Sequence, residues 1–174
     1  MDLFPSAVLM EYVPDSAWNE RAVLNVVYQL LSVLRYLIKS GICHFDFDES
    51  NVMLTFDIEE YDDNHRQADS NWGKVRLIDF GLGKRYLPSD TETRHQIHSL
   101  DEYKYCYEGC DDNSRFLSFA KGLVARSQNP SEASLKKLLS LLSSINSHST
   151  DHEIASIQEH SVFDSVRQLQ KVPF

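Results

Sequence analysis

Residues 44–54 read HFDFDESNVML, and residues 75–81 read VRLIDFG. The first segment carries Asp46 and, five residues later, Asn51, and the second places Asp79 directly after an apolar run. Because short apolar runs predict strands, these polar side chains are expected on loops that adjoin strands. The five-residue gap allows Asp46 and Asn51 to face one ion site from a single loop. Carboxylates can accept a proton, and carboxylate and amide oxygens are ligands that Mg²⁺ prefers.

A long helix is expected just before the first segment, from about residue 20 to residue 39. Its apolar residues recur every three or four positions, so one wide face of the helix is buried. They are Val23, Val26, Val27, Leu30, Leu31, Leu34, Leu37 and Ile38. Ser40 and Gly41 close this helix. Towards the N-terminus, residues 7–13 (AVLMEYV) predict a buried strand that ends at Pro14.

Most of the remaining chain is expected to be helical. Helices are predicted over residues 113–126 and from about residue 130 to residue 145, and residues 150–169 are predicted to be helical in pieces. The acidic stretch 57–73 is far longer than a hairpin turn requires, so it is predicted to be a solvated insertion. No internal repeat or domain boundary is visible. Residues 1–174 are therefore expected to form one α+β domain, mostly helical, with a few short strands.

The overall charge argues against two classes of partner. The chain has 174 residues and a formal charge of −9, from 17 basic and 26 acidic side chains. Nucleic acids and anionic membranes both reward dense Lys and Arg, so neither is expected as a partner. The longest apolar stretches are also broken by polar residues before they reach the roughly 20 residues that a membrane span needs.

The cysteines argue for a reducing environment. Cys43, Cys106 and Cys110 are an odd number of cysteines and include no Cys-x-x-Cys pair. A disulfide framework or a zinc ribbon is therefore not expected, and an intracellular location, cytoplasmic or nuclear, fits better. His95 and His98 lie near two of these cysteines in the sequence, but separate thiols are a better interpretation than a metal site.

A long apolar helix, a His-x-Asp loop with an Asn five residues later, and a strand that ends in Asp-Phe-Gly together resemble the C-terminal lobe of protein kinases. The resemblance implies an ATP-dependent phosphotransferase that acts on a serine or threonine hydroxyl of a protein substrate. It implies that Asp46 is the catalytic base and that Asn51 and Asp79 hold Mg²⁺ on the ATP phosphates. If the resemblance is set aside, Asp46, Asp48 and Asp79 read as solvated loop carboxylates.

The hinge-like segment 9–13 (LMEYV) resembles the strand and linker that hold adenine in kinases. By this resemblance Met10 is the gatekeeper, and backbone groups of Glu11 and Val13 bind the edge of the adenine ring. Met53 is then expected beneath the ring. As ordinary core residues, the same apolar side chains would look no different.

The resemblance extends to residues around the loop and to a subfamily. His44 and Phe80 match residues that stack in the regulatory spine of a kinase. Asp112 resembles the buried aspartate that anchors the catalytic loop, and Asp111 is a rival for that role. Residues 82–86 (LGKRY) resemble the casein-kinase group. The absence of Ala-Pro-Glu, the insertion before Asp79 and the ending QEHSVF over residues 158–163 look more like haspin-type kinases.

Several departures from the kinase pattern bear on activity. Asp48 stands where protein-serine kinases have a Lys that touches the γ-phosphate, and Phe45 replaces the Arg that answers a phosphorylated activation loop. No G-x-G-x-x-G occurs, and the strand Lys with its Glu partner is not found in the chain. Weak or undetectable catalysis is therefore expected from this chain alone, unless a separate N-lobe or another binding partner supplies the rest of the nucleotide clamp.

Two other functions remain open at this point. One is a pseudokinase or truncated product that acts as a binding module, which the missing N-lobe favours and the intact Asp46, Asn51 and Asp79 oppose. The other is a small-molecule kinase of the aminoglycoside or choline phosphotransferase type. Those enzymes share His-x-Asp and Asn but usually lack an Asp-Phe-Gly followed by a basic, aromatic run.

Overall fold

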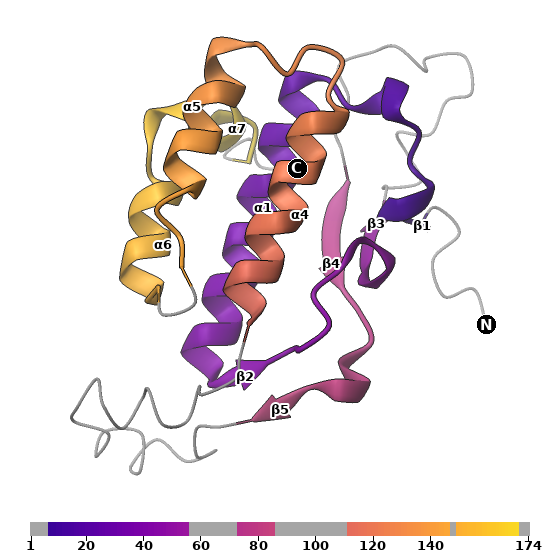
Figure 1. Ribbon diagram of the computed structural model, residues 1–174, viewed down its shortest axis with the longest axis vertical. Helices are drawn as coiled ribbons and strands as arrows, with labels where there is room; N and C mark the ends of the chain where they lie inside the picture. The colour runs from indigo at the N-terminus through magenta and orange to yellow at the C-terminus, as the bar shows by residue number, and fades with distance from the viewer. Residues whose placement is uncertain (1–6, 56–72, 86–110, 147–148, 171–174) are drawn as a thin grey trace.

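The computed structural model describes residues 7–55, 73–85, 111–146 and 149–170. Helices α1 and α4 run side by side through the middle of the molecule, with α5, α6 and α7 on one side and a small sheet on the other (Figure 1). The fold is α+β and mostly helical, as the sequence predicts. Of the expected insertion over residues 57–73, residues 57–72 lie outside the described part of the chain, as do Cys106, Cys110, His95 and His98.

Helix α1, Glu20–Ser40, forms the centre of the core. It begins where the side chain of Asn19 accepts a 2.9 Å hydrogen bond from the amide of Ala22, and it ends at Gly41. Gly41 has a φ of 62°, a left-handed conformation that glycine adopts without steric cost. The helix buries the whole apolar face that its periodicity predicts: Val23, Val26, Val27, Leu30, Leu31, Leu34, Leu37 and Ile38.

By length and composition, α1 also passes the test for a membrane span, and it is the one helix in the described ranges that does so. The sequence led us to expect that polar residues interrupt every apolar stretch before it reaches this length, and α1 is the exception. Within the fold, 56% of the most apolar window of α1 is buried against the rest of the protein. Core packing therefore accounts for the hydropathy of this helix without a membrane.

Two small antiparallel sheets flank the helices. The larger has the order β1-β3-β4, formed by Ala7–Leu9, Val52–Thr55 and Lys74–Leu77, with Leu9 opposite Met53 and Val52 opposite Leu77. In the smaller sheet, β2 (Ile42–Cys43) pairs with β5 (Lys84–Arg85). The strand predicted over residues 7–13 is wrong in its second half, because Met10–Tyr12 coil into a 3₁₀ turn after Leu9.

The C-terminal helices follow the predicted pattern closely. Helix α4 covers Asp112–Arg126 and α5 covers Ala133–Leu142, so α5 begins and ends about three residues inside its predicted span. The last segment is helical in pieces, as expected, with α6 over Asp151–Gln158 and α7 over Asp164–Gln170. Thr150 and Glu153 form a reciprocal capping box at the start of α6, which explains why this helix begins there.

Helix α6 is joined to α1 by ionic and hydrogen bonds. The guanidinium of Arg35 contacts the carboxylate of Asp151 at 2.7 Å, and Lys39 approaches the same carboxylate at 3.2 Å. Arg35 also donates a 2.8 Å hydrogen bond to the side chain of Gln158, whose own amide donates to the carbonyl of Tyr28. These contacts fix the register of α6 against the middle of α1.

Cys43 forms a disulfide, although the sequence favoured a reducing environment. It is fully buried in β2 and disulfide-bonded, and its partner lies outside the described residues. One disulfide is not the disulfide framework that the sequence argues against, but it removes the support that the cysteines gave to a reducing environment. Spacing could not reveal this bond, because a disulfide depends on which cysteines the fold brings together.

Candidate catalytic site

The loop that follows β2 is anchored from below by Asp112, at the start of α4. One carboxylate oxygen of Asp112 accepts a 2.6 Å hydrogen bond from the amide of His44, and the other accepts a 2.9 Å bond from the amide of Phe45. Phe45 has a φ of 65°, and this left-handed turn lets both successive amides point at one carboxylate. Of the two rival aspartates, the structure gives the anchoring contacts to Asp112, while Asp111 pairs with Arg115.

Asp112 holds the loop at an electrostatic cost. Its side chain is nearly fully buried, and this burial raises the pKa of Asp112 above its ordinary value. The hydrogen bonds from the His44 and Phe45 amides act in the opposite direction, because they stabilise the ionised carboxylate. The anchor is therefore a buried carboxylate whose two oxygens need both amide donors.

His44 connects this loop to the segment that carries Asp79. Its ring is fully buried, and Nε2 donates a 2.9 Å hydrogen bond to the carbonyl of Ile78. Nδ1 accepts a 3.3 Å bond from the amide of Asp46. The ring also meets that of Phe80 edge to face, with centroids 4.6 Å apart. The two motifs recognised in the sequence are thus brought into direct contact.

The carboxylate of Asp46 is held from two sides. Asn51 Nδ2 donates a 2.8 Å hydrogen bond to Oδ2, and the guanidinium of Arg115, on α4, lies 3.7 Å from Oδ1. Arg115 is itself fixed by Asp111, whose oxygens lie 2.8 and 2.9 Å from its Nε, and this bond raises the pKa of Arg115. The side chain of Asp46 is 44% exposed, so an oriented carboxylate remains accessible to a substrate hydroxyl.

Asn51 and Asp79 are suited to hold a hard cation. The amide nitrogen of Asn51 is used by Asp46, which accepts at its carbonyl oxygen (2.9 Å) and at Oδ2, so the side-chain oxygen of Asn51 is left for a ligand. The amide of Ile78 donates to the backbone carbonyl of Asn51 at 2.9 Å, which brings Asp79 next to this loop. Mg²⁺ commonly uses one or two protein oxygens together with phosphate oxygens, and this donor set fits that pattern.

The backbone of Asp79 has an unusual conformation. Its φ is 58°, and Asp79 and Phe45 are the two non-glycine residues with positive φ in the described ranges. The carboxylate accepts a 3.1 Å bond from the amide of Gly81, where an added Cβ would lie 3.0 Å from that carboxylate. Backbone conformations of this kind persist only where the surrounding structure enforces them, and they gather at functional sites.

The backbone of the hinge-like segment is hydrogen-bonded within the protein. Met10 is fully buried, while Glu11 and Tyr12 are exposed and Met53 is half-buried. The amide of Val13 donates a 3.1 Å bond to the carbonyl of Met10, and the carbonyl of Val13 accepts a 2.5 Å bond from Arg126. Both backbone groups of Val13 that were predicted to bind adenine therefore already have partners within the protein.

Asp48 has a local structural role. Its carboxylate accepts hydrogen bonds from the amide (3.1 Å) and the hydroxyl (3.3 Å) of Ser50 and so caps the 3₁₀ turn Glu49–Asn51. An aspartate is favoured at such a position. The structure thus explains the carboxylate at the place where the kinase pattern has a Lys.

Two arginines at the site were not found from the sequence. Arg115 contacts Asp46, and Arg126 contacts Glu49 in the same loop, both from α4. Each pair joins residues far apart along the chain, so no local pattern signals it. The spacing of Asp111 and Arg115, four positions along one helix, was the one available hint.

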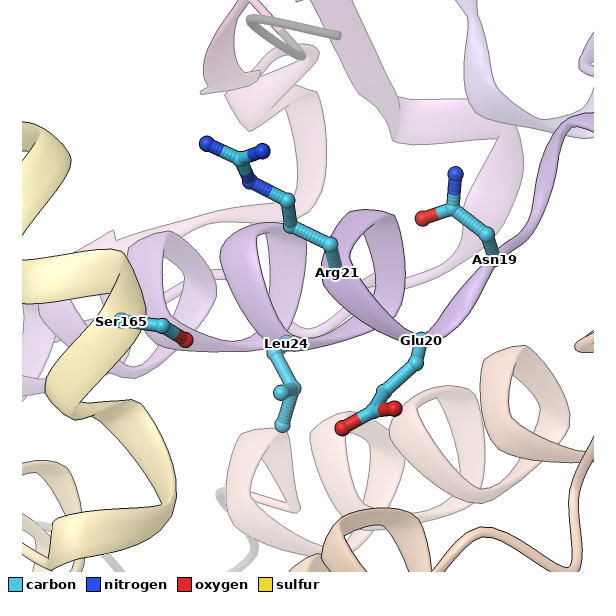
Figure 2. A pocket seen from close by; sticks show the side chains of 5 residues that line it. All are labelled: Asn19, Glu20, Arg21, Leu24 and Ser165. Carbon is cyan, nitrogen blue, oxygen red and sulfur yellow. The ribbon is translucent and has the colours of Figure 1, made fainter. Parts of the chain in front are cut away.

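A shallow pocket of about 380 Å³ lies elsewhere, at the start of α1. It is lined by Asn19, Glu20, Arg21, Leu24 and Ser165, none of which was predicted as a site residue. Figure 2 shows Glu20 and Leu24 pointing to one side of α1 and Arg21 to the other. The polar groups do not converge on one point, so this pocket does not compete with the site around Asp46.

Comparison with known proteins gives a limited result. No protein-family model matches the chain. The chain is similar to serine/threonine-protein kinase 17A of Oryctolagus cuniculus, with 26% identity over 89 residues. The match covers 51% of this chain and 19% of that kinase, so the chain spans a small part of the relative's length. This similarity supports a kinase-like character for the chain and nothing finer.

Proposed function

We propose that this chain is the catalytic lobe of an ATP-dependent, protein serine/threonine kinase-like phosphotransferase. The observation that carries the proposal is the orientation of Asp46. Asn51 and Arg115 contact its carboxylate from two sides, and Asp112 anchors the loop to which Asp46 belongs. A carboxylate held in this way, yet accessible, is suited to orient a hydroxyl and accept its proton.

The residues have separate roles in this reaction. The hydroxyl oxygen of the protein substrate forms a bond to the γ-phosphorus of ATP, the bond from that phosphorus to the bridging oxygen breaks, and the hydroxyl proton passes to Asp46. Asn51 and Asp79 hold Mg²⁺, which when bound neutralises charge on the phosphates. Adenine lies beside Met10 and Met53, with the carbonyl of Glu11 as the acceptor, since the backbone groups of Val13 are engaged.

The exposed apolar residues near Asp79 support a partner for this lobe. Phe80 is 48% exposed and Leu82 is 63% exposed, which is unusual for large apolar side chains beside a polar site. We assign this face to an N-lobe, supplied by a separate segment or chain. The acidic charge supports a protein substrate rather than nucleic acid or a membrane. Residues 82–86 and 158–163 support an atypical kinase of the casein-kinase or haspin type.

Two observations favour a second function. The amide of Val13, which is engaged by the carbonyl of Met10, and the carboxylate of Asp48 both disfavour nucleotide binding, as expected for a catalytically weak pseudokinase that acts as a binding module. Such a module would keep the fold and lose the phosphoryl transfer.

The two functions are separated by measuring phosphate transfer from radiolabelled ATP to a mixture of casein and histone substrates. Wild type and Asp46→Asn are compared, with Asp164→Asn as a control, because Asp164 pairs with Arg167 on α7, away from the loop. Transfer that requires Asp46 and survives Asp164→Asn supports the phosphotransferase. Equal background transfer by all three folded proteins, together with no binding of Mg·ATP by the wild-type chain, contradicts it and favours the binding module.

A further inference from the structure

Arg126, the last residue of α4, joins this helix to two other segments of the chain. Its guanidinium donates to the carbonyl of Val13 at 2.5 Å, to the carboxylate of Asp15 at 2.7 Å and to the carboxylate of Glu49 at 2.7 Å. The same group lies 5.6 Å from the centre of the Trp18 ring. Its side chain is 22% exposed, so these contacts are partly shielded from water and salt.

The three acceptors belong to two parts of the proposed nucleotide site. Val13 ends the hinge-like segment and Asp15 follows it, whereas Glu49 lies between Asp46 and Asn51 in the catalytic loop. A guanidinium presents its donors in a rigid, planar arrangement, so it fixes the distance between the acceptors that it joins. Arg126 thereby sets the position of the hinge-like segment relative to the loop.

We propose that Arg126 is a positioning residue for a magnesium-bound nucleoside triphosphate. It holds the hinge-like segment and the loop at the spacing at which one such ligand binds with its base at the first and its phosphates at the second. This inference rests on the proposed function, because it takes the hinge-like segment as the base site and the loop as the metal-phosphate site. A ligand that spans two prearranged subsites avoids the cost of ordering them on binding. A ligand that occupies one subsite gains nothing from the spacing between them.

This reasoning separates a positioning role from a merely structural one. If Arg126 is a positioning residue, its loss lowers the affinity for ATP, which spans both segments. The affinities for adenosine alone and for tripolyphosphate alone stay the same, because each of these ligands occupies one segment. If Arg126 only stabilised the fold, its loss would lower the apparent affinity for all three ligands equally, because each ligand binds the same folded population.

The test uses three probes with the full chain: Mg·ATP, adenosine, and Mg·tripolyphosphate. Mg·ATP is titrated calorimetrically, and the two weaker probes are titrated by NMR. The variants are Arg126→Gln, Glu49→Gln, and Arg35→Gln as a matched control. Arg35 is 27% exposed and pairs with Asp151 on α6, so its loss removes a comparable ion pair away from the site.

We expect Arg126→Gln to weaken Mg·ATP binding about tenfold and to change the affinity for adenosine and for Mg·tripolyphosphate less than about twofold. Glu49→Gln keeps Arg126 and weakens one of its three contacts, so it should show the same selective loss at smaller size. It also provides the test if Arg126→Gln does not fold. Arg35→Gln should bind all three probes as wild type does.

Two outcomes overturn the inference alone: wild-type affinity for Mg·ATP in the Arg126 and Glu49 variants, or an equal loss of affinity for all three probes. If the folded wild-type chain binds none of the probes, the proposed function fails, and the inference falls with it. The two failures are distinguished by the wild-type titrations.

Discussion

The side-chain amide of Asn51 lies 2.8 Å from the carboxylate of Asp46 and donates a hydrogen bond to it. One side chain thus orients the proposed base with its nitrogen and presents its oxygen to the proposed metal. The base and the metal site are therefore coupled through Asn51, and a change at this residue should affect both.

Asn51→Ala removes the hydrogen bond to Asp46 and one proposed Mg²⁺ ligand. We expect phosphate transfer to fall about a hundredfold or more, since single electrostatic contacts at active sites are commonly worth that much. Single-turnover transfer at several Mg²⁺ concentrations measures the effect. Asn51→Asp is the matched comparison, because it keeps the oxygen but sets a second carboxylate against Asp46. Full activity in Asn51→Ala would contradict the role.

Arg115→Ala tests the cation beside Asp46. We expect the transfer rate to fall about tenfold, because Asp46 loses the charge that holds Oδ1 in place. The stability of the protein should change by less than about 1 kcal/mol, since the pair is largely exposed and such ion pairs contribute little. Arg115→Lys should recover part of the rate. A large loss of stability without a rate effect would show that Arg115 only supports the fold.

Asp112→Asn tests the anchor beneath the loop. An asparagine offers one acceptor oxygen where the amides of His44 and Phe45 both need one, so one amide is left facing an amide nitrogen. We expect the free energy of unfolding to fall by about 1–3 kcal/mol, the cost of a buried donor without a partner. Urea denaturation measures this loss. The neighbouring Asp111→Asn, at a 48% exposed side chain, should have little effect on stability.

Acid should weaken the contact between α1 and α6 through Asp151. Burial raises the pKa of Asp151, but hydrogen bonds from Arg35 and Lys39 outweigh it, so the pKa lies below its ordinary value. A carboxyl whose pKa is lowered by folding adds stability above its unfolded pKa of about 3.9, and this is lost as the pH falls through the folded value. The stability difference between wild type and Asp151→Asn should therefore be largest near neutral pH and shrink below about pH 4. Urea midpoints at several pH values check this, and a constant difference would contradict it.

Local patterns in the sequence predicted the helices well. The apolar period of α1, its start near residue 20 and its end at Gly41 agree with the structure because helix periodicity and caps are local properties. The strand over residues 7–13 was wrong beyond Leu9, because an apolar run does not by itself distinguish a strand from a buried 3₁₀ turn at Met10.

The sequence predicted the polar residues of the candidate site but not the arginines that hold them in place. Asp46, Asn51 and the segment of Asp79 meet through contacts that the two motifs suggested. Arg115 and Arg126 were missed, because their partners in the loop and the hinge-like segment lie far away in the sequence. The hydrogen bonding of the hinge-like segment within the protein was missed for the same reason, since it depends on Arg126 as well as on a local turn.

The central claim is that Asn51 and Asp79 bind a magnesium-bound nucleotide next to Asp46, and calorimetric titration of the purified chain with ATP tests it most directly. The titration is made with and without Mg²⁺, on wild type, on Asp79→Asn, and on Asp48→Asn as a control that keeps the cap of its 3₁₀ turn. The account predicts binding that requires Mg²⁺, is lost in Asp79→Asn and survives in Asp48→Asn. Equal binding with and without Mg²⁺, or no binding by a folded chain, would contradict it.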